Sequence, residues 1–167
     1  MERVINIELI DYLTKKGLIS KCQHGFLRKH STYSNLHESV NDWSLSPKNC
    51  TTTDIIFIDL KKAFDSVSYQ KLLSKIESYG IQGDLLEWLK AFLTDRTQTV
   101  KIRNRISSNI SITSGVPQGS VLGPLLFLLH INDITDIAVG LDVNLKLFAD
   151  DAKLYSSFAI ISVHRLI

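Results

Sequence analysis

The sequence predicts an α+β fold in which helices pack on one face of an antiparallel sheet. A run of β-branched and apolar residues at 53–60 is typical of a strand. Apolar and polar residues alternate on both sides of Asp150-Asp151, as expected for a β-hairpin. Elsewhere apolar residues recur at helical spacing, as at 4–13 and 85–93. These patterns together predict strands from distant parts of the chain and helices that cover them.

The composition predicts one globular domain. The chain has 167 residues, 44% of them hydrophobic, which is enough for a sizeable core. Its net charge of +2 permits a nucleic-acid partner without requiring one. Cys22 and Cys50 match no metal-ligand spacing, which fits a reducing intracellular setting.

The sequence shows no targeting segment and no membrane span. The longest apolar run, 121–129, is broken by Gly123-Pro124 and is too short to cross a bilayer, so no membrane partner is expected. The chain opens directly on the helix at 4–13, and we expect that a preceding segment is missing. The oligomeric state does not follow from the sequence.

A basic segment precedes the second expected helix. Arg28, Lys29 and His30 lie just before Ser31 and Thr32, either of which can cap that helix. Cations beside a helix N-terminus suit a phosphate, and a solvated basic loop explains them equally well. Residues 41–53 are rich in Ser, Thr and Asn and predict a surface connection.

The apolar run at 53–60 predicts a buried central strand that ends in Asp59. An acid in that place seldom serves stability. Asp65 lies just beyond and is most simply the cap of the next helix, which stops at Gly80. A further helix starts at Asp84, and both helices are expected to pack on the sheet.

Residues 97–106 alternate between apolar and cationic side chains, which predicts a strand with one face of each kind. The cations are Lys101, Arg103 and Arg105. They suit either solvated surface or contact with a nucleic-acid backbone. Residues 110–113 are expected to pair back as a second strand.

The loop SGVPQGS at 114–120 places two glycines around a proline. Such a loop lets the backbone approach a ligand closely in a fixed shape, with Gln118 as donor and acceptor. Ser120 can then cap the apolar helix at 121–131. Because Gly-Pro loops before helices are common, the loop by itself identifies no site.

Asp150-Asp151 lies where the predicted hairpin turns. Adjacent carboxylates repel each other, so a folded chain usually compensates them with a cation or a metal. Ordinary turn chemistry explains the pair if it is taken alone. The second acidic strand end at Asp59 favours a metal site. The last segment, 158–167, begins apolar and has no recognisable stop.

Three ordered motifs resemble the reverse transcriptase domain of non-LTR retrotransposons, the polymerases of long interspersed elements. They are FIDLKKAFDSV at 57–67, SGVPQGSVLGPLLF at 114–127 and FADD at 148–151. QHGF at 23–26 with Ser31-Thr32 is similar to the family's fingers segment, and 96–100 is also family-like. FADD alone is weak evidence, whereas three motifs in order at compatible spacing make a strong signal.

The resemblance implies a polymerase palm with part of the fingers. Residues 1–52 would be partial fingers, 53–95 palm with the first catalytic aspartate, and 96–135 the strand pair with the SGVPQGS loop and its helix. Residues 136–167 would hold the acidic hairpin of a truncated palm, and the thumb is expected to be absent.

The implied activity is RNA-templated DNA synthesis with an RNA template, a DNA primer and deoxynucleoside triphosphates. Nucleotidyl transfer of this kind uses two divalent ions, Mg²⁺ or Mn²⁺, which take oxygen ligands. The resemblance assigns the metal-ligand role to Asp59 and Asp150, which would meet across neighbouring strands, with Asp151 as a third ligand. A nuclear location is compatible with the family.

The resemblance also implies nucleotide contacts. The backbone of Leu60 and Lys61 would cradle the triphosphate, Phe64 would exclude a 2′-hydroxyl, and the loop would offer Gln118 and Gly119 to the nucleotide. A plain core aromatic remains the alternative for Phe64. His30 replaces an arginine common in the family, so the triphosphate contact falls to Arg28 or Lys29.

Two other classes of function stay open. One is a non-catalytic remnant that folds and at most binds nucleic acid or protein. The other, a phosphoacceptor domain, would need Asp150-Asp151 at a strand-to-helix crossing, and the alternation around the pair argues against it. Within the family reading, we expect the isolated chain not to polymerise.

Overall fold

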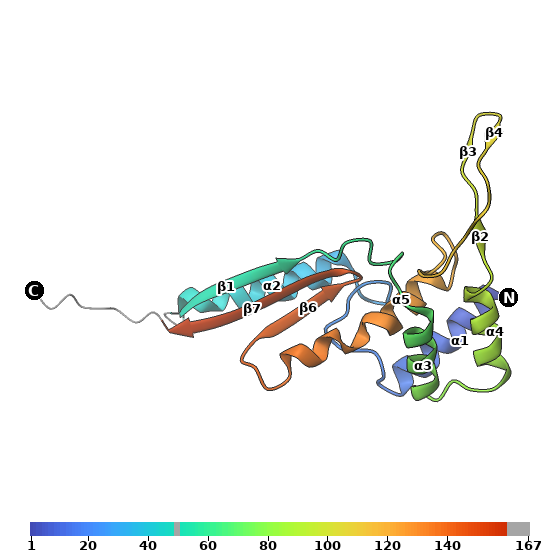
Figure 1. Cartoon of the computed structure of the whole chain (residues 1–167). Helices are drawn as coiled ribbons and strands as arrows, with labels where there is room; N and C mark the ends of the chain where they lie inside the picture. The colour runs from blue at the N-terminus through green and yellow to red at the C-terminus, as the bar shows by residue number, and fades with distance from the viewer. Residues whose placement is uncertain (49–50, 160–167) are drawn as a thin grey trace, which may run out of the picture. The chain divides into compact units, whose positions relative to one another are not determined.

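Residues 1–48 and 51–159 are described by a computed structural model (Figure 1). The chain divides into two compact units. The first contains Met1–Ile19 and Lys61–Asn132, and the second contains Ser20–Leu60 and Asp133–Ile167. The predicted combination of helices with an antiparallel sheet is confirmed.

The first unit is mainly helical. Its helices are α1 (Glu2–Lys15), α3 (Tyr69–Ser78), α4 (Asp84–Leu93) and α5 (Gly123–Ile131). Helix α5 is buried on most of its surface, whereas the other three bury a single apolar stripe each, such as Leu9 and Leu13 of α1. A helix that is apolar on all sides is typically at the centre of a core, whereas helices with a single apolar stripe surround it and face solvent on their other side.

Helix α3 is capped by Ser68, whose hydroxyl accepts a hydrogen bond from the Lys71 amide. The prediction that Asp65 caps this helix is therefore wrong. Residues 61–66 form turns that delay the start of the helix, and the Asp65 carboxylate bonds elsewhere, as described below.

A two-part β-ribbon extends from the first unit as an arm (Figure 1). Strand β2 (Thr97–Gln98) pairs with β5 (Ile110–Ser111), and β3 (Lys101–Ile102) pairs with β4 (Arg105–Ile106). The predicted pairing of 110–113 is confirmed for β5, but the single strand predicted at 97–106 is wrong. The chain reverses at Arg103-Asn104, where Arg103 has a φ of 53° and asparagine favours a turn.

The ribbon does not separate apolar from cationic side chains. Lys101 lies opposite Ile106, and Ile102 lies opposite Arg105, so residues of both kinds share each face. The prediction of one apolar and one cationic face is wrong because it counted alternation straight through the turn. All four of these side chains are exposed.

The second unit contains the antiparallel sheet. Strands β1 (Thr51–Ile58), β7 (Asp151–Ala159) and β6 (Asn144–Phe148) lie in the order β1-β7-β6 (Figure 1). Helix α2 (Thr32–Lys48) covers one face of the sheet. On the other face Leu145 and Leu147 pack with residues of the 3-10 helix η1 (Asn132–Ala138).

Two predictions for this unit are wrong. Helix α2 continues through Lys48 where a surface connection was predicted, because Ser46 turns inward and is bonded to Thr53 and Ser157 of the sheet. Strand β1 is not a buried central strand. It pairs only with β7 among the described strands, and Phe57 is 69% exposed.

Some predictions fall on residues outside the described ranges, namely Cys50 and most of 158–167, of which Phe158 and Ala159 end β7. No helix in the part of the chain that the structure describes has the length and apolar character to cross a membrane.

Candidate functional site

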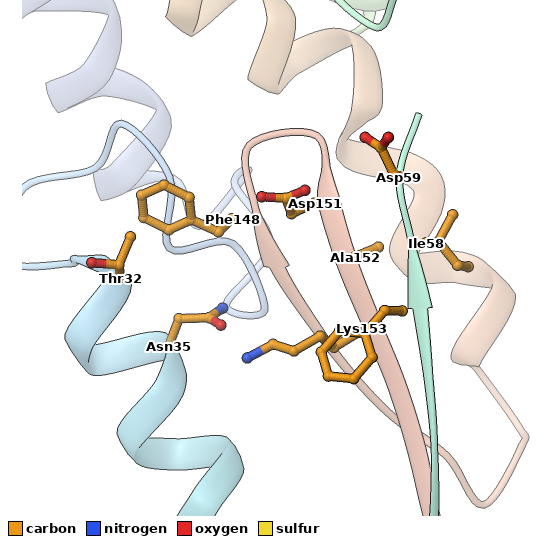
Figure 2. Close-up of a pocket in the computed structure, with 9 residues that line it drawn as sticks. Thr32, Asn35, Ile58, Asp59, Phe148, Asp151, Ala152 and Lys153 are labelled. Carbon is orange, nitrogen blue, oxygen red and sulfur yellow. The ribbon is translucent and has the colours of Figure 1, made fainter. Parts of the chain in front are cut away.

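The second unit holds an acidic pocket of about 400 Å³. Strand β1 ends one residue before Asp59, and β7 begins with Asp151, so both carboxylates line this pocket (Figure 2). At this end of the β1–β7 register Ile58 pairs with Ala152. The next position along each strand places Asp59 beside Asp151, which explains why the two acids share the site.

The turn of the hairpin carries the third acid. The predicted hairpin is present, but Phe148 pairs with Asp151, so the turn residues are Ala149 and Asp150, where Asp150-Asp151 was predicted. Asp150 does not line the pocket. The structure therefore brings Asp59 together with Asp151, while the sequence had suggested that Asp59 and Asp150 meet.

No basic side chain of the described residues pairs with these acids. Among residues 1–48 and 51–159, the side chains of Asp59, Asp150 and Asp151 make no hydrogen bond or ion pair. The pocket's lysine, Lys153, donates instead to the Ser39 hydroxyl at 2.9 Å. Burial, and to a lesser degree the nearby Lys146, lowers the pKa of Lys153.

The donor set fits a hard divalent ion with few protein ligands. The described residues contain no cluster of three or more His, Cys, Asp or Glu side chains arranged to hold a metal. Mg²⁺, however, keeps several waters and is commonly bound through one or two carboxylates plus substrate phosphates. Asp59 and Asp151 provide those two carboxylates, and their mutual repulsion favours a cation between them.

The QHGF segment holds the turn of the acidic hairpin. The side-chain oxygen of Gln23 accepts hydrogen bonds from the Gly25 amide at 2.7 Å and the Ala149 amide at 2.9 Å. Gln23 is 3% exposed. From the sequence we had assigned this segment only a likeness to the fingers. No local pattern indicated its role, because Ala149 lies 126 positions away and only the fold brings the two together.

The neighbouring histidines bond to each other and to helix α2. His24 Nδ1 lies 3.0 Å from the Ser34 hydroxyl and 3.3 Å from His30 Nδ1. His24 Nε2 lies 3.6 Å from the Glu38 carboxylate, which also pairs with Lys146. Burial is the main cause that lowers the pKa of His24, and Glu38 opposes it. His30, which stands where an arginine is common in the resembled family, thus packs against His24.

The basic segment itself lies at the surface, with Arg28 and Lys29 exposed. Ser31 caps α2, because its hydroxyl accepts a hydrogen bond from the Ser34 amide at 3.1 Å. This cap was predicted from the sequence. The structure leaves the question of a phosphate at Arg28 and Lys29 untested.

In the first unit, the SGVPQGS loop lies against the segment that follows the first motif. The Gly115 amide donates to the Val67 carbonyl at 2.8 Å, and the Val116 amide donates to the Phe64 carbonyl at 2.9 Å. Gly115 has a φ of 91°, and a Cβ on it would lie 2.9 Å from the Asp65 Cα. The loop therefore needs glycine here for close approach to its own chain.

Gln118 is fixed by Asp65. Its side-chain amide donates to the Asp65 carboxylate at 2.9 Å, and both residues line a pocket of about 450 Å³ with Tyr69 and Arg96. The adjacent Gly119 is exposed. A glutamine held by one bond in an open polar pocket remains available for a ligand.

Two side chains serve the N-terminus of α5. The Ser120 hydroxyl accepts a hydrogen bond from the Gly123 amide at 2.9 Å, as predicted. The Glu2 carboxylate accepts from the Val121 amide at 2.9 Å and the Leu122 amide at 3.3 Å, which the sequence did not reveal. Unpaired amides at a helix start favour such an anion.

Phe64 is half-buried and stacks on Phe127, with ring centroids 4.1 Å apart and an interplanar angle of 18°. This stack accounts for an aromatic at position 64 by packing alone, so it supports the core alternative and leaves sugar selection untested. Of the two residues expected to cradle a triphosphate, Leu60 is half-buried and Lys61 is exposed.

Residues 1–164 match the family model described as "Reverse transcriptase (RNA-dependent DNA polymerase)". The chain belongs to the reverse transcriptase family. The predicted resemblance is confirmed.

Relatives of this reverse transcriptase domain come from mobile elements of Drosophila melanogaster. A probable RNA-directed DNA polymerase from transposon BS is 34% identical over 93% of this chain and 18% of its own length. The RNA-directed DNA polymerase from mobile element jockey is 34% identical over 90% of this chain and 17% of its own length. The chain thus spans less than a fifth of these relatives.

Solved structures share the fold. Telomerase from Candida albicans, in complex with a TWJ fragment of telomeric RNA, superposes with a TM-score of 0.69 at 16% identity. The match covers 91% of this chain and 30% of that one. Apo telomerase from Candida tropicalis gives a TM-score of 0.67 at 15% identity, over 93% of this chain and 33% of that one. At such identities the likeness concerns the fold alone, and it agrees with the predicted palm-like α+β architecture.

Proposed function

We propose that this reverse transcriptase domain serves RNA-templated DNA synthesis, the activity named for its mobile-element relatives. The observation that carries the proposal is the pocket that Asp59 and Asp151 line together, where neither carboxylate pairs with a basic side chain of residues 1–48 or 51–159. Two carboxylates at neighbouring strand ends offer the oxygen ligands that a hard divalent cation takes.

In this proposal Asp59 and Asp151 hold divalent ions, Mg²⁺ or Mn²⁺, and Asp150 contributes from the turn. Two such ions, when bound, activate the primer hydroxyl and stabilise the leaving pyrophosphate. The protein's part is to fix the carboxylates on paired strands, so that their separation changes little during the reaction.

Other residues would bind the substrates. Gln118, oriented by Asp65, contacts the incoming nucleotide together with Gly119, and the backbone at Leu60 and Lys61 contacts its triphosphate. Phe64 contacts the sugar. Phe64→Ala in an active polymerase is therefore expected to incorporate ribonucleotides. An unchanged preference for deoxynucleotides would show that Phe64 serves only packing in the core.

Cations of the chain would bind phosphates. Arg28 and Lys29 suit the triphosphate, and the exposed cations of the ribbon suit the backbones of the RNA template and DNA primer. The ribbon cations are Lys101, Arg103 and Arg105. Because these are few phosphate contacts and the chain spans 17–18% of its relatives, we expect the 167-residue chain alone to dissociate rapidly and not to polymerise processively.

The test is a chimera in which this chain replaces the matching segment of the jockey polymerase, assayed for extension of a DNA primer on an RNA template. We expect metal-dependent synthesis that Asp59→Asn and Asp151→Asn abolish. Asp54→Asn, on the same strand but outside the pocket, should leave the rate unchanged. A folded chimera that is inactive beside an active parent would favour the non-catalytic alternative.

A further inference from the structure

The turn of the acidic hairpin contains an alanine in a conformation that alanine avoids. Ala149 has a φ of 56°, in the left-handed region where the Cβ is crowded by the backbone. It is 5% exposed and lies directly before Asp150. The direction in which the chain enters β7, and therefore the position of Asp151, depends on this conformation.

Gln23 contacts both polar backbone groups of Ala149. Its side-chain oxygen accepts from the Ala149 amide at 2.9 Å, and its side-chain nitrogen donates to the Ala149 carbonyl at 3.4 Å. The two residues are 126 positions apart in the sequence. The side-chain amide of this buried glutamine therefore both donates to and accepts from the Ala149 backbone, as the backbone of a neighbouring strand does in a sheet.

The backbone around Gln23 reinforces this pairing. The Leu147 amide donates to the Cys22 carbonyl at 2.8 Å, and the His24 amide donates to the Leu147 carbonyl at 2.9 Å. At Gly25 a Cβ would lie 2.4 Å from the Ala149 nitrogen, so only glycine permits the approach. The segment from Cys22 to Gly25 thus contacts the end of β6 and the first residue of the turn.

We propose that Gln23 is a positioning residue for the acidic hairpin: it holds Ala149 in the left-handed turn that directs Asp151 into the pocket with Asp59. Gln23 does not line that pocket, so it acts through Ala149. The part of the inference that concerns metal affinity rests on the proposed function. The part that concerns the turn does not.

The test compares the wild-type 167-residue chain with Gln23→Met, which keeps the side-chain length and removes both hydrogen-bonding groups. Gln70→Met, on an exposed position of α3, is the matched control. Hydrogen exchange of the Ala149 amide and the ¹³C shifts of Ala149 report the turn directly. A Mn²⁺ titration reports the carboxylates.

In Gln23→Met we expect the Ala149 amide to exchange at least about tenfold faster and its ¹³C shifts to leave the left-handed range, while the amides of Leu145 and Leu154 keep their protection. The affinity for Mn²⁺ should fall by about 10–100-fold, as for residues that orient metal ligands. Gln70→Met should change neither quantity.

Gln23→Glu provides a conservative rescue. A protonated carboxyl accepts from the Gly25 and Ala149 amides and donates to the Ala149 carbonyl, as the glutamine amide does, so Ala149 should remain protected at acidic pH. If Gln23→Met fails to fold, Gly25→Ala takes its place, because the added Cβ displaces the Ala149 amide while Gln23 is retained.

Unchanged exchange and ¹³C shifts at Ala149 in Gln23→Met would overturn the proposal. So would a uniform loss of protection across β7 with Mn²⁺ affinity unchanged, since that result would make Gln23 a residue of general stability. If the wild type binds no Mn²⁺, the proposed function fails, and the Ala149 measurements still decide whether Gln23 holds the turn.

Discussion

Single residues decide how closely the loops of this domain approach other parts of the chain. The sequence predicted that the glycines of SGVPQGS permit a close backbone approach, which is right for Gly115. It did not predict what is approached, because Asp65 lies 50 positions earlier and only the fold brings the two together. The same holds for Gln23 and Ala149, and for the bond from Gln118 to Asp65.

Gly115→Ala should destabilise the protein by about 1–3 kcal/mol, because alanine is strained at positive φ and its Cβ would meet the Asp65 backbone. Gly119→Ala is the matched control. Gly119 has a φ of 81° but nothing within 4 Å of its Cβ position, so only the backbone strain applies. Urea denaturation measures both, and equal losses in the two variants would show that the contact with Asp65 adds nothing.

Stability should fall as the pH is lowered through the range just below the usual pKa of histidine. Burial lowers the pKa of His24 in the folded protein. The nearby Glu38 carboxylate raises this pKa, and repulsion from His30, Lys146 and Lys153 lowers it further. The unfolded chain therefore binds the proton more readily, and protonation favours unfolding. The stabilising contribution of neutral His24 is fully present when the pH is above the pKa of about 6.5 that histidine has in the unfolded chain.

Denaturant unfolding between pH 7.5 and pH 5.5 measures this dependence. In His24→Asn the slope of unfolding free energy against pH should be smaller than in the wild type. His37→Gln, an exposed position on α2, should keep the wild-type slope. The carboxylate of Glu38, whose pKa is lowered mainly by its hydrogen bond with Lys146, contributes only at more acidic pH. A wild-type slope retained in His24→Asn would contradict this assignment.

Local patterns predicted an element well where nearby residues showed both its periodicity and the turn or cap that ends it. The β6–β7 hairpin, the stripes of α1, α3 and α4, and the Ser120 cap followed from spacing and turn chemistry. Strand β1 was placed correctly, but its exposure was not, because burial of a strand depends on neighbours far away in the chain. The ribbon at 97–106 was misread because alternation continues through its turn.

The ribbon should supply part of the affinity for nucleic acid. Replacing Lys101, Arg103 and Arg105 together by alanine should weaken binding to an RNA–DNA duplex. The slope of log affinity against log salt should fall by about two to three, since each lost phosphate contact removes ~0.9. Fluorescence anisotropy at several salt concentrations measures the slope. Lys15, Lys16 and Lys71, which are exposed on or next to helices, form a control triple variant of equal charge. If the slope falls equally in both variants, the cations of the ribbon contribute no more to nucleic-acid binding than other exposed lysines.

At the scale of the whole molecule, three ordered motifs were sufficient to identify the family, because three motifs in order at compatible spacing seldom occur together by chance. They were not sufficient to place the acids. The motif FADD does not say which aspartate shares a pocket with Asp59, and the strand register answers with Asp151. The chain spans 17–18% of the length of its mobile-element relatives.

The central claim, that Asp59 and Asp151 form a site for a divalent cation, is tested most directly by thermal unfolding in millimolar Mn²⁺. At about a hundred times the dissociation constant, binding to the native state alone adds ~2.7 kcal/mol, or roughly 5–10 °C for a domain of this size. The wild type and Asp54→Asn should show this rise, and Asp59→Asn should not. A melting temperature that Mn²⁺ leaves unmoved in the wild type, or an equal rise in Asp59→Asn, would contradict the claim.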